Sequence, residues 1–177
     1  MDLRAKKTER ALREAFLALR AEKPLERISV RELCERAEVG KGTFYLHYHS
    51  VYDLSEQLQR TVVEDILAAL EDPQLILTDT EQFTREFTLA LLAQHEVINA
   101  LFSGGQEGVL PLAIEAGIRE HLFELRPSLR DDVRLNVLLT YQIQGSFHAY
   151  HSHATGGMDE NVFDVVVQAS GLLSTIW

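Results

Sequence analysis

The sequence predicts an all-α protein with an N-terminal three-helix part and a larger C-terminal helical part. At four of the predicted helix starts a Ser or Thr is followed three residues later by an acidic residue, a pattern that caps helix starts. After these places apolar side chains recur at helical spacing, and proline or glycine interrupts the pattern. The four capping pairs are Ser29–Glu32, Ser50–Asp53, Thr78–Glu81 and Ser128–Asp131.

Length and composition fit a protein with a buried core. The chain has 177 residues, and 46% of them are hydrophobic. It contains no run of 18 uncharged apolar residues, and its N-terminus lacks the apolar core of a secretory signal. The single cysteine, Cys34, excludes an intramolecular disulfide and fits a reducing compartment. A soluble cytoplasmic protein with no membrane association is therefore expected.

Charge is distributed unevenly along the chain, whose formal net charge is −10. Residues 1–60 hold 12 Lys and Arg against 10 Asp and Glu, a charge of +2, whereas residues 61–177 hold 5 against 17, a charge of −12. Every lysine lies at or before Lys41. Either the N-terminal segment meets a polyanion, or the chain simply has a mixed-charge surface beside an acidic domain.

Residues 3–22 are predicted to form the first helix, which ends before Pro24. Its apolar stripe consists of Leu12, Ala15, Phe16 and Leu19. Cations crowd its N-terminal half, although the helix dipole favours acids there. This placement suits an approach to phosphates, and an ordinary charged N-terminus is the alternative. The cations are Arg4, Lys6, Lys7, Arg10 and Arg13.

Residues 29–48 predict two short helices joined by a tight turn. The first has a narrow apolar face, formed by Val30, Leu33, Cys34 and Ala37. Gly40 is expected to take the left-handed conformation that ends it. The second helix begins near Lys41 and is too short to be stable alone. A short helix with basic, small polar and aromatic residues after a tight turn suits the major groove of DNA.

Within the second short helix the side chains separate into two groups. Phe44 and Tyr48 lie four residues apart and are expected to be core, while Tyr45 points elsewhere. Residues 39–45, Val-Gly-Lys-Gly-Thr-Phe-Tyr, with the following His-Tyr at 47–48 and Asp-Leu at 53–54, resemble the DNA-binding signature of TetR-family transcriptional regulators. The resemblance covers roughly the first third of the chain.

The resemblance implies a helix-turn-helix DNA-binding domain at residues 1–49 and a helical regulatory domain, for ligand binding and dimerisation, at residues 50–177. The family's DNA contacts carry over to Arg31, Lys41, Gly42, Thr43, Tyr45, Leu46 and His47. Of these, Thr43 can reach a base edge or a thymine methyl group. The Tyr45 hydroxyl can donate to a phosphate, and Leu46 offers an apolar contact only.

The chain departs from the family pattern at one position. Where the family usually has a lysine shortly after the recognition helix, this sequence has Val51, which cannot bind a phosphate. His49 or Arg60 could compensate for the missing cation. The departure implies DNA binding that is weaker or more sensitive to salt.

The resemblance also implies a function. The chain would be a sequence-specific transcriptional regulator that binds double-stranded operator DNA, a repressor released by a small apolar effector. The alternative is a partner-dependent co-regulator of the same fold that has no small-molecule inducer. An enzyme is the weakest hypothesis, because no Ser-His-Asp or paired-carboxylate spacing demands catalysis.

The remaining helices are predicted at residues 51–70, 78–94, 95–102, 111–125, 129–151 and 159–177. The last two are apolar on more than one face, so each needs two partners. A homodimer that pairs these two helices across a two-fold axis supplies the second partner, as the resemblance also implies. Complete burial within a monomer is the alternative. Residues 165–167 could instead form a strand, although the flanking period favours a helix.

No cofactor and no metal are predicted. His148, His151 and His153 cluster near a helix end, but no cysteine ligand lies nearby, and histidines there also suit the helix dipole. Cys34 is expected to be a buried core residue. The glycine-rich stretch at 103–108 lacks the Lys-Ser/Thr that follows a phosphate-binding loop.

Overall fold

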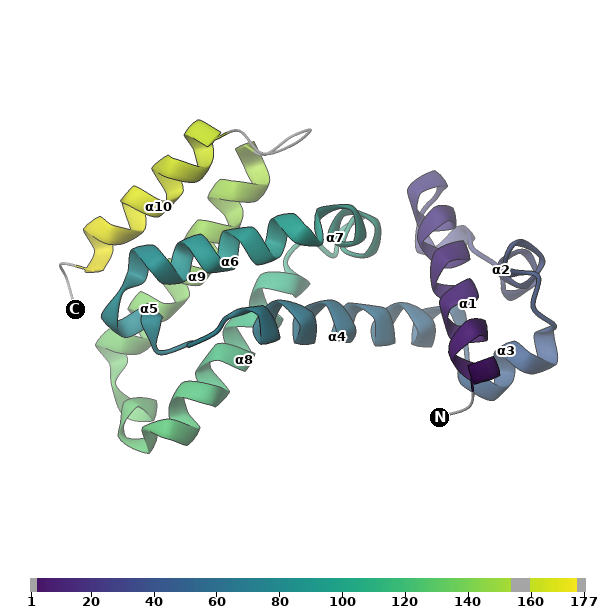
Figure 1. Cartoon of the computed structure of the whole chain (residues 1–177), viewed down its shortest axis with the longest axis horizontal. Coiled ribbons are helices and arrows are strands. Elements are labelled where there is room, and N and C mark those ends of the chain that lie inside the picture. Colours follow the sequence, from purple (N-terminus) through teal and green to yellow (C-terminus); the bar gives the residue numbers. More distant parts are fainter. Residues whose placement is uncertain (1–2, 154–159, 175–177) are drawn as a thin grey trace. The chain divides into compact units, whose positions relative to one another are not determined.

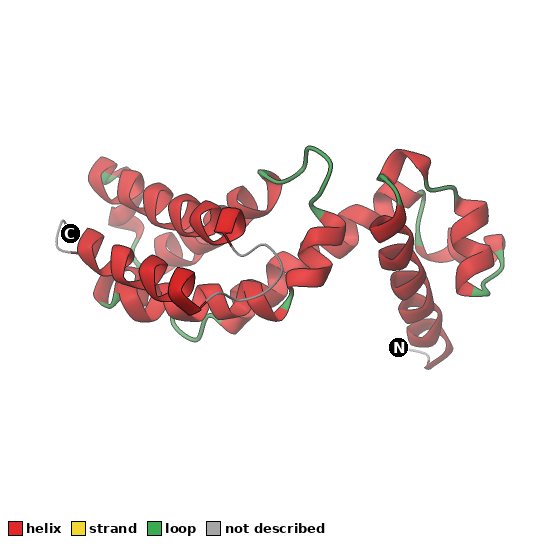
Figure 2. Cartoon of the chain, turned by 90° about the horizontal axis from the view of Figure 1, so that it is seen from above, coloured by secondary structure: helices red, strands yellow, loops and turns green. Residues whose placement is uncertain are grey.

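The computed structural model describes residues 3–153 and 160–174, and within these ranges the chain forms helices and turns without a strand (Figures 1 and 2). This confirms the all-α fold class. The α-helices are α1 (Leu3–Glu22), α2 (Val30–Ala37), α3 (Lys41–His47), α4 (Val51–Ala69), α5 (Leu75–Thr78), α6 (Thr80–Ala93), α7 (His95–Leu101), α8 (Val109–Leu125), α9 (Val133–His153) and α10 (Glu160–Ser174). Two short 3-10 helices, η1 (Leu25–Arg27) and η2 (Pro127–Asp131), complete the set.

The chain divides into two compact units, which are described separately. The N-terminal unit comprises the chain up to Val62 together with Glu96–Glu107, and the C-terminal unit comprises Val63–His95 with the described residues from Gly108 onward. The predicted division at residues 49 and 50 concerns which residues bind DNA and which bind an effector, and it stays a prediction.

The segment Glu96–Glu107 is joined to the N-terminal helices by side-chain hydrogen bonds. The Gln59 amide donates to the Leu101 carbonyl at 3.1 Å and to the Gln106 side chain at 2.6 Å. The buried Arg20 guanidinium donates to the Ser103 hydroxyl at 3.1 Å. A stretch distant in sequence is thus part of the N-terminal unit.

The apolar stripe of α1 forms the centre of the N-terminal unit, as predicted. Leu12, Phe16 and Leu19 are fully buried, and α1 packs against α2. The predicted cap of α2 is confirmed, because the Ser29 hydroxyl accepts a hydrogen bond from the Glu32 N–H at 3.2 Å. The Glu32 carboxylate pairs with Lys23, which lies just beyond the end of α1.

The end of α2 differs from the prediction that Gly40 would take the left-handed conformation. Glu38 has φ 55° and ψ 37°, the left-handed region, whereas Gly40 is extended with φ −68° and ψ 143°. The left-handed conformation occurs at the residue that directly follows Ala37, the last residue of α2, and that residue is Glu38. A side chain in this conformation costs about 1–2 kcal/mol relative to right-handed backbone.

In the C-terminal unit α6 packs against α10, α8 against α9, and α5 against α6. Residues 165–167 lie inside α10, so the helical prediction for them is confirmed. Two helix caps were predicted wrongly. Asp79 rather than Thr78 caps α6 by accepting from the Gln82 N–H at 3.0 Å, and Asp132 rather than Ser128 accepts from the Leu135 N–H at 3.0 Å.

Asp79 and Asp132 take the cap positions because the residues predicted to do so, Thr78 and Ser128, belong to the helices that precede α6 and α9. Thr78 is the last residue of α5, and Ser128 lies within η2. A carboxylate at a helix start also interacts favourably with the helix dipole. No helix in the described part of the chain is both long enough and apolar enough to cross a membrane.

Apolar side chains remain exposed on the last two helices. On α9, Val137 is 59% and Tyr141 65% exposed; on α10, Val165 is 63% and Leu172 73% exposed. The opposite side of α10 is buried, with Phe163, Val166 and Val167 in the core. Complete burial of these two helices within a single subunit is therefore excluded.

Candidate nucleic-acid interface

Helix α3 is held in place by its aromatic residues. Phe44 is fully buried and Tyr48 nearly so, and their ring centroids lie 5.7 Å apart. Both were predicted as core, and the burial confirms this. Because a seven-residue helix is unstable by itself, these two rings fix which edge of α3 faces outward.

The seven predicted DNA contacts lie on α2 and α3, and most of them are exposed. Tyr45 is 56% and Leu46 84% exposed, values that are high for large apolar side chains. A Cβ added to Gly42 would meet no atom within 4 Å, so space remains in front of the backbone there. Arg31 and Lys41 are also exposed, whereas Thr43 and His47 are half-buried.

Arg31 is paired within its own helix. Its Nε lies 2.8 Å from Glu35 Oε1, and this hydrogen bond, with the charge of Glu35, raises the pKa of Arg31. Both side chains are largely exposed, and exposed pairs of this kind contribute little to stability. Opening the pair would therefore cost little if Arg31 turned to a phosphate.

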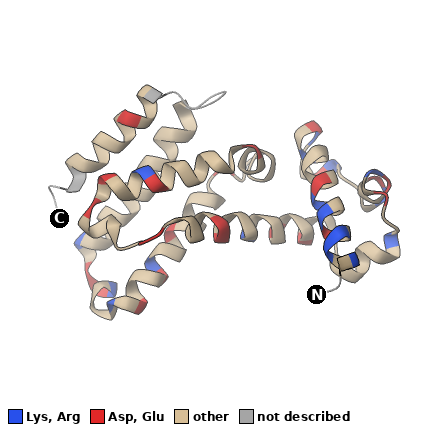
Figure 3. Ribbon diagram, viewed as in Figure 1, with Lys and Arg blue, Asp and Glu red and all other residues tan. Residues whose placement is uncertain are grey.

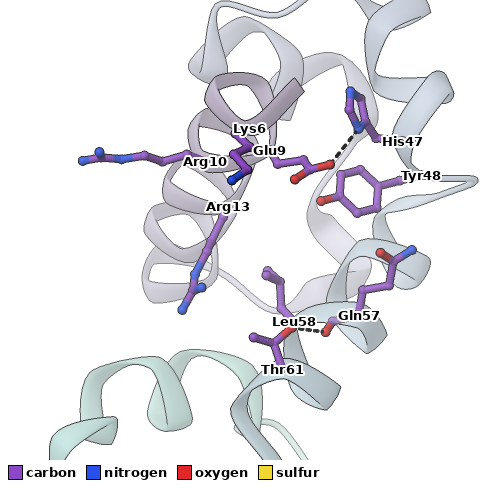
Figure 4. Close-up of a pocket in the computed structure, with 9 residues that line it drawn as sticks. All are labelled: Lys6, Glu9, Arg10, Arg13, His47, Tyr48, Gln57, Leu58 and Thr61. Carbon is purple, nitrogen blue, oxygen red and sulfur yellow. Dashed lines mark hydrogen bonds and ion pairs between the residues drawn. The ribbon is translucent and has the colours of Figure 1, made fainter. Parts of the chain in front are cut away.

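His47 differs from the other predicted contacts because it faces α1. Its Nδ1 lies 3.3 Å from Glu9 Oε1, as the dashed line in Figure 4 shows, and its side chain is only 19% exposed. The contact is an ion pair only when the imidazole is protonated. No sequence pattern indicated this contact, since the two residues lie on different helices.

The start of α4 is capped by two hydrogen bonds in a variant of the capping box. The Ser50 hydroxyl accepts from the Asp53 N–H at 3.1 Å, and the Asp53 carboxylate accepts at 2.8 Å from the N–H of His49, the residue before the cap. The His49 N–H and the Gln57 side chain lower the pKa of Asp53. Val51, in the position where the resemblance implies a lysine, is buried in the core of the unit.

A cleft of about 460 Å³ opens between α1 and the end of α3 with the adjoining part of α4. Lys and Arg gather along α1 in Figure 3, and Figure 4 shows the side chains around the cleft. The individual cations were noted in the sequence, but the opposite wall comes from residues distant along the chain and was missed. The lining consists of Lys6, Glu9, Arg10, Arg13, His47, Tyr48, Gln57, Leu58 and Thr61.

Neither thiol chemistry nor a metal cluster is evident near this interface. Cys34 is 4% exposed, and burial raises the pKa of its thiol, which disfavours the reactive thiolate. Within residues 3–153 and 160–174, no three His, Cys, Asp or Glu side chains are grouped so that they could hold a metal ion.

Comparisons with known proteins point to one family. The model of bacterial regulatory proteins of the tetR family matches residues 12–58. The uncharacterized HTH-type transcriptional regulator YxbF of Bacillus subtilis (strain 168) is 31% identical over 64 residues, which are 36% of this chain but only 17% of that protein. The crystal structure of a TetR transcriptional regulator from Rhodococcus sp. RHA1 aligns with a TM-score of 0.56 and 20% identity over 99% of both chains, a likeness of fold. Residues 12–58 of this chain therefore match the TetR family of bacterial regulatory proteins.

Proposed function

We propose that this protein is a homodimeric repressor that binds a near-palindromic operator in the cytoplasm and leaves it when a small effector binds the C-terminal unit. Each α3 would enter a major groove, and the two grooves would lie about 34–36 Å apart. The family and the fold are those of transcription regulators rather than enzymes.

The outward edge of α3 is the observation that carries the proposal. Phe44 and Tyr48 are buried, and the residues between and before them stand outside the core. Tyr45 and Leu46 are costly to leave in water but suit a groove that offers phosphates, base edges and thymine methyl groups. A solvated surface helix would carry charged residues at these two positions instead.

The test is a binding titration with DNA fragments that the purified protein selects from genomic DNA. Replacing Tyr45 by Phe removes one phosphate hydrogen bond, so affinity should fall about 5-fold for every sequence, the equivalent of about 1 kcal/mol. Thr43→Ala should mainly reduce the preference for the selected sequence. The matched control is Thr78→Ala, because Thr78 is exposed but lies at the end of α5 in the C-terminal unit. Unchanged affinity in both α3 variants would show that this helix does not read DNA.

The exposed apolar residues of α9 and α10 support the homodimer. A second copy of these helices would cover Val137, Tyr141, Val165 and Leu172, which water otherwise contacts. Leu172→Glu should convert a dimer into a monomer of 20.1 kDa in sedimentation equilibrium. Leu112→Glu is the control, since Leu112 is 62% exposed on α8. A wild-type protein that is monomeric at micromolar concentration contradicts the dimer.

An unpaired acceptor inside the C-terminal unit supports the effector. The Gln142 amide donates to Thr84 Oγ1 at 2.7 Å, and Thr84 donates its own proton to the Thr80 carbonyl at 2.7 Å. While the Thr84 proton is donated to the Thr80 carbonyl, Thr84 Oγ1 can only accept from Gln142, which favours this orientation of the amide. Gln142 Oε1 is then buried without a donor from the described residues, and the Tyr150 hydroxyl is buried likewise. A small apolar molecule with one hydrogen-bond donor would satisfy Oε1.

The alternative is a co-regulator that works through a protein partner and has no small-molecule inducer. A thermal-shift screen separates the two, because a ligand that binds only the folded state raises the melting temperature. A hit whose shift disappears in Gln142→Leu supports the effector site between α6 and α9. If no compound shifts the melting temperature and a protein partner is needed for DNA binding, the co-regulator replaces the repressor.

A further inference from the structure

A single polar contact joins α3 to α1 in the described part of the chain. The Nδ1 atom of His47, the last residue of α3, lies 3.3 Å from Oε1 of Glu9 on α1, and Figure 4 shows the two side chains pointing toward each other. A helix as short as α3 is unstable by itself. Phe44 and Tyr48 hold α3 on the core, so the contact with Glu9 is the one that ties its C-terminal end to α1.

The surroundings of His47 differ from those of the outward-facing residues of α3. The His47 side chain is 19% exposed, whereas Tyr45 and Leu46 are more than half exposed. The family resemblance implies a DNA contact for all three residues. A side chain that is mostly covered and directed at α1 instead acts within the protein, through the residue that it touches.

Charged groups on α1 and α4 surround the end of α3, and α2 contributes none to the cleft lining. The remaining charged residues of the lining are cations of α1, namely Lys6, Arg10 and Arg13. On α4, the Asp53 carboxylate already accepts hydrogen bonds from its own segment. Burial, and then the charges of Glu9 and Asp53, raise the pKa of Tyr48, in keeping with a Glu9 charge close to the end of α3. Glu9 is therefore the acid available to His47.

We propose that His47 is a positioning residue, which fixes the C-terminal end of α3 against α1 through Glu9 and acts on DNA only through that helix. This inference rests on the proposed function, because the position of α3 matters for binding only if the helix enters the groove. The contact is an ion pair while the imidazole is protonated. A cation also suits the C-terminal end of a helix, where the dipole is negative. DNA affinity should therefore follow the protonation of this imidazole.

Removal of the acid gives the sharpest test, because two roles for His47 predict opposite signs. If His47 touched a phosphate directly, Glu9 would only repel DNA, and Glu9→Gln should strengthen binding. If Glu9 holds His47 in place, the same variant should bind DNA about 3-fold more weakly, a loss within the range of partly exposed ion pairs. The matched control is Glu14→Gln, which removes an exposed acid of α1 outside the cleft and should not weaken binding. Affinity in Glu9→Gln at or above that of the wild type would overturn the proposal.

A double-mutant cycle tests whether the two side chains act together. His47→Gln should weaken DNA binding by about the same factor as Glu9→Gln. The double variant Glu9→Gln/His47→Gln should lose no more affinity than either single variant, because the two residues form one pair. Losses that multiply in the double variant would contradict the pairing, since independent effects add in free energy.

The pH dependence of DNA binding provides an independent readout. Between about pH 6 and about pH 8 an imidazole loses most of its charge, so wild-type affinity should fall about 2-fold to 3-fold more than that of Glu9→Gln. His49→Gln is the control, because His49 is exposed and its backbone N–H, which the variant keeps, makes the bond to Asp53. This control should retain the wild-type pH profile. An identical profile in Glu9→Gln would overturn the proposal, since the titrating group would then act without Glu9.

Thermal unfolding of the DNA-free variants shows whether the effect is local. Melting temperatures within a few degrees of the wild type are expected, because a partly exposed pair adds little to global stability. A larger fall in Glu9→Gln would overturn the positioning role, since the lost affinity would then reflect unfolding. The failure of this pair is separable from the failure of the proposed function. In the first case the wild type binds its selected DNA and only the predicted differences between variants are missing, whereas in the second the wild type binds no duplex at low salt.

Discussion

The two units of the molecule are stabilised in different ways. The N-terminal unit has an apolar interior, and its polar groups act mainly at helix ends, as in the Ser29 and Ser50 caps. The C-terminal unit buries polar side chains between its helices. Of the eight buried polar or charged residues among those described, only Arg20 and Ser55 belong to the N-terminal unit.

The polar interior of the C-terminal unit depends on long-range partners. Glu115 on α8 accepts from Thr140 at 2.6 Å and from Gln144 at 2.9 Å, both on α9, as well as from Arg119. The Ser170 hydroxyl on α10 lies 3.2 Å from the Thr80 carbonyl. A buried polar group is tolerated only while its partner is present. The packing of the C-terminal unit therefore depends on specific polar partners, whereas that of the N-terminal unit depends mainly on apolar contacts.

The apolar interior of the N-terminal unit predicts the greatest loss of stability. Phe44→Ala empties a fully buried position and should lower the free energy of unfolding by about 3–5 kcal/mol. Because the ring anchors α3, DNA binding should be lost as well. Urea denaturation measures the change, and Tyr45→Ala at the exposed neighbouring position should cost far less. Similar losses for the two variants would contradict the packing described.

The polar interior of the C-terminal unit predicts the next largest loss. Glu115→Ala leaves Arg119, whose side chain is only 20% exposed, without its acidic partner. Removing one member of such a pair costs about 3 kcal/mol, toward the low end of the range for buried pairs because Arg119 retains some solvent. Glu120→Ala is the control, an exposed glutamate on the same helix. Equal stability of the two variants would mean that the network contributes nothing.

The same carboxylate makes the stability of the C-terminal unit depend on pH. Burial alone would raise the pKa of Glu115, but hydrogen bonds from Thr140, Gln144 and Arg119 hold it below the ordinary carboxyl value. A depressed pKa stabilises the folded state above the unfolded pKa, and this contribution is lost as pH falls through the folded pKa. Between about pH 6 and pH 3 the wild type should therefore lose more stability than Glu115→Gln, as chemical denaturation at each pH would show.

A smaller effect compares two glycines of the C-terminal unit. A Cβ at Gly117 would collide with the Leu67 side chain, whereas a Cβ at Gly145 would meet no atom within 4 Å. Both replacements gain helix propensity, up to about 1 kcal/mol, but Gly117→Ala must also displace the Leu67 side chain, so it should be the less stable of the two by about 1 kcal/mol or more. A lower melting temperature is expected for Gly117→Ala than for Gly145→Ala, and equal melting temperatures would contradict the close approach of α4 and α8.

The turn of the N-terminal unit predicts the least change. Glu38 is the one non-glycine residue with positive φ in the described part of the chain. Glu38→Gly should gain about 0.5–1 kcal/mol, because glycine avoids the steric cost but loses more backbone freedom on folding. Glu38→Ala should change stability little, since alanine keeps that cost. A loss of stability in Glu38→Gly would show that the side chain has a role of its own.

The two units also differ in how much of them the sequence predicts. Helix α1, the Ser29 and Ser50 caps and the burial of Phe44 follow from residues within a few positions of one another, which is the range that periodicity and capping patterns cover. The caps at Asp79 and Asp132 were missed because the short helices before them were not foreseen.

The contacts that no local pattern could predict are those between distant segments. The cleft needs α1 beside α3 and α4, and the Gln142–Thr84 hydrogen bond joins residues 58 positions apart. The same holds for the pairing of His47 with Glu9. The positions of the predicted DNA contacts came from the sequence, and the structure adds how exposed each side chain is. That these residues contact DNA stays a prediction.

The membership of Glu96–Glu107 in the N-terminal unit has a consequence for protein engineering. A biosensor made by fusing only the first 62 residues to a foreign sensing module would discard Leu101, which is fully buried, and the Ser103 partner of Arg20. The truncated N-terminal unit would expose the apolar surface that Leu101 covers, and Arg20 would keep only its 3.4 Å hydrogen bond to the Lys23 carbonyl. A hybrid protein should instead keep both segments of the N-terminal unit, the chain up to Val62 and Glu96–Glu107. The foreign sensing module must therefore be connected to both segments and not to residue 62 alone.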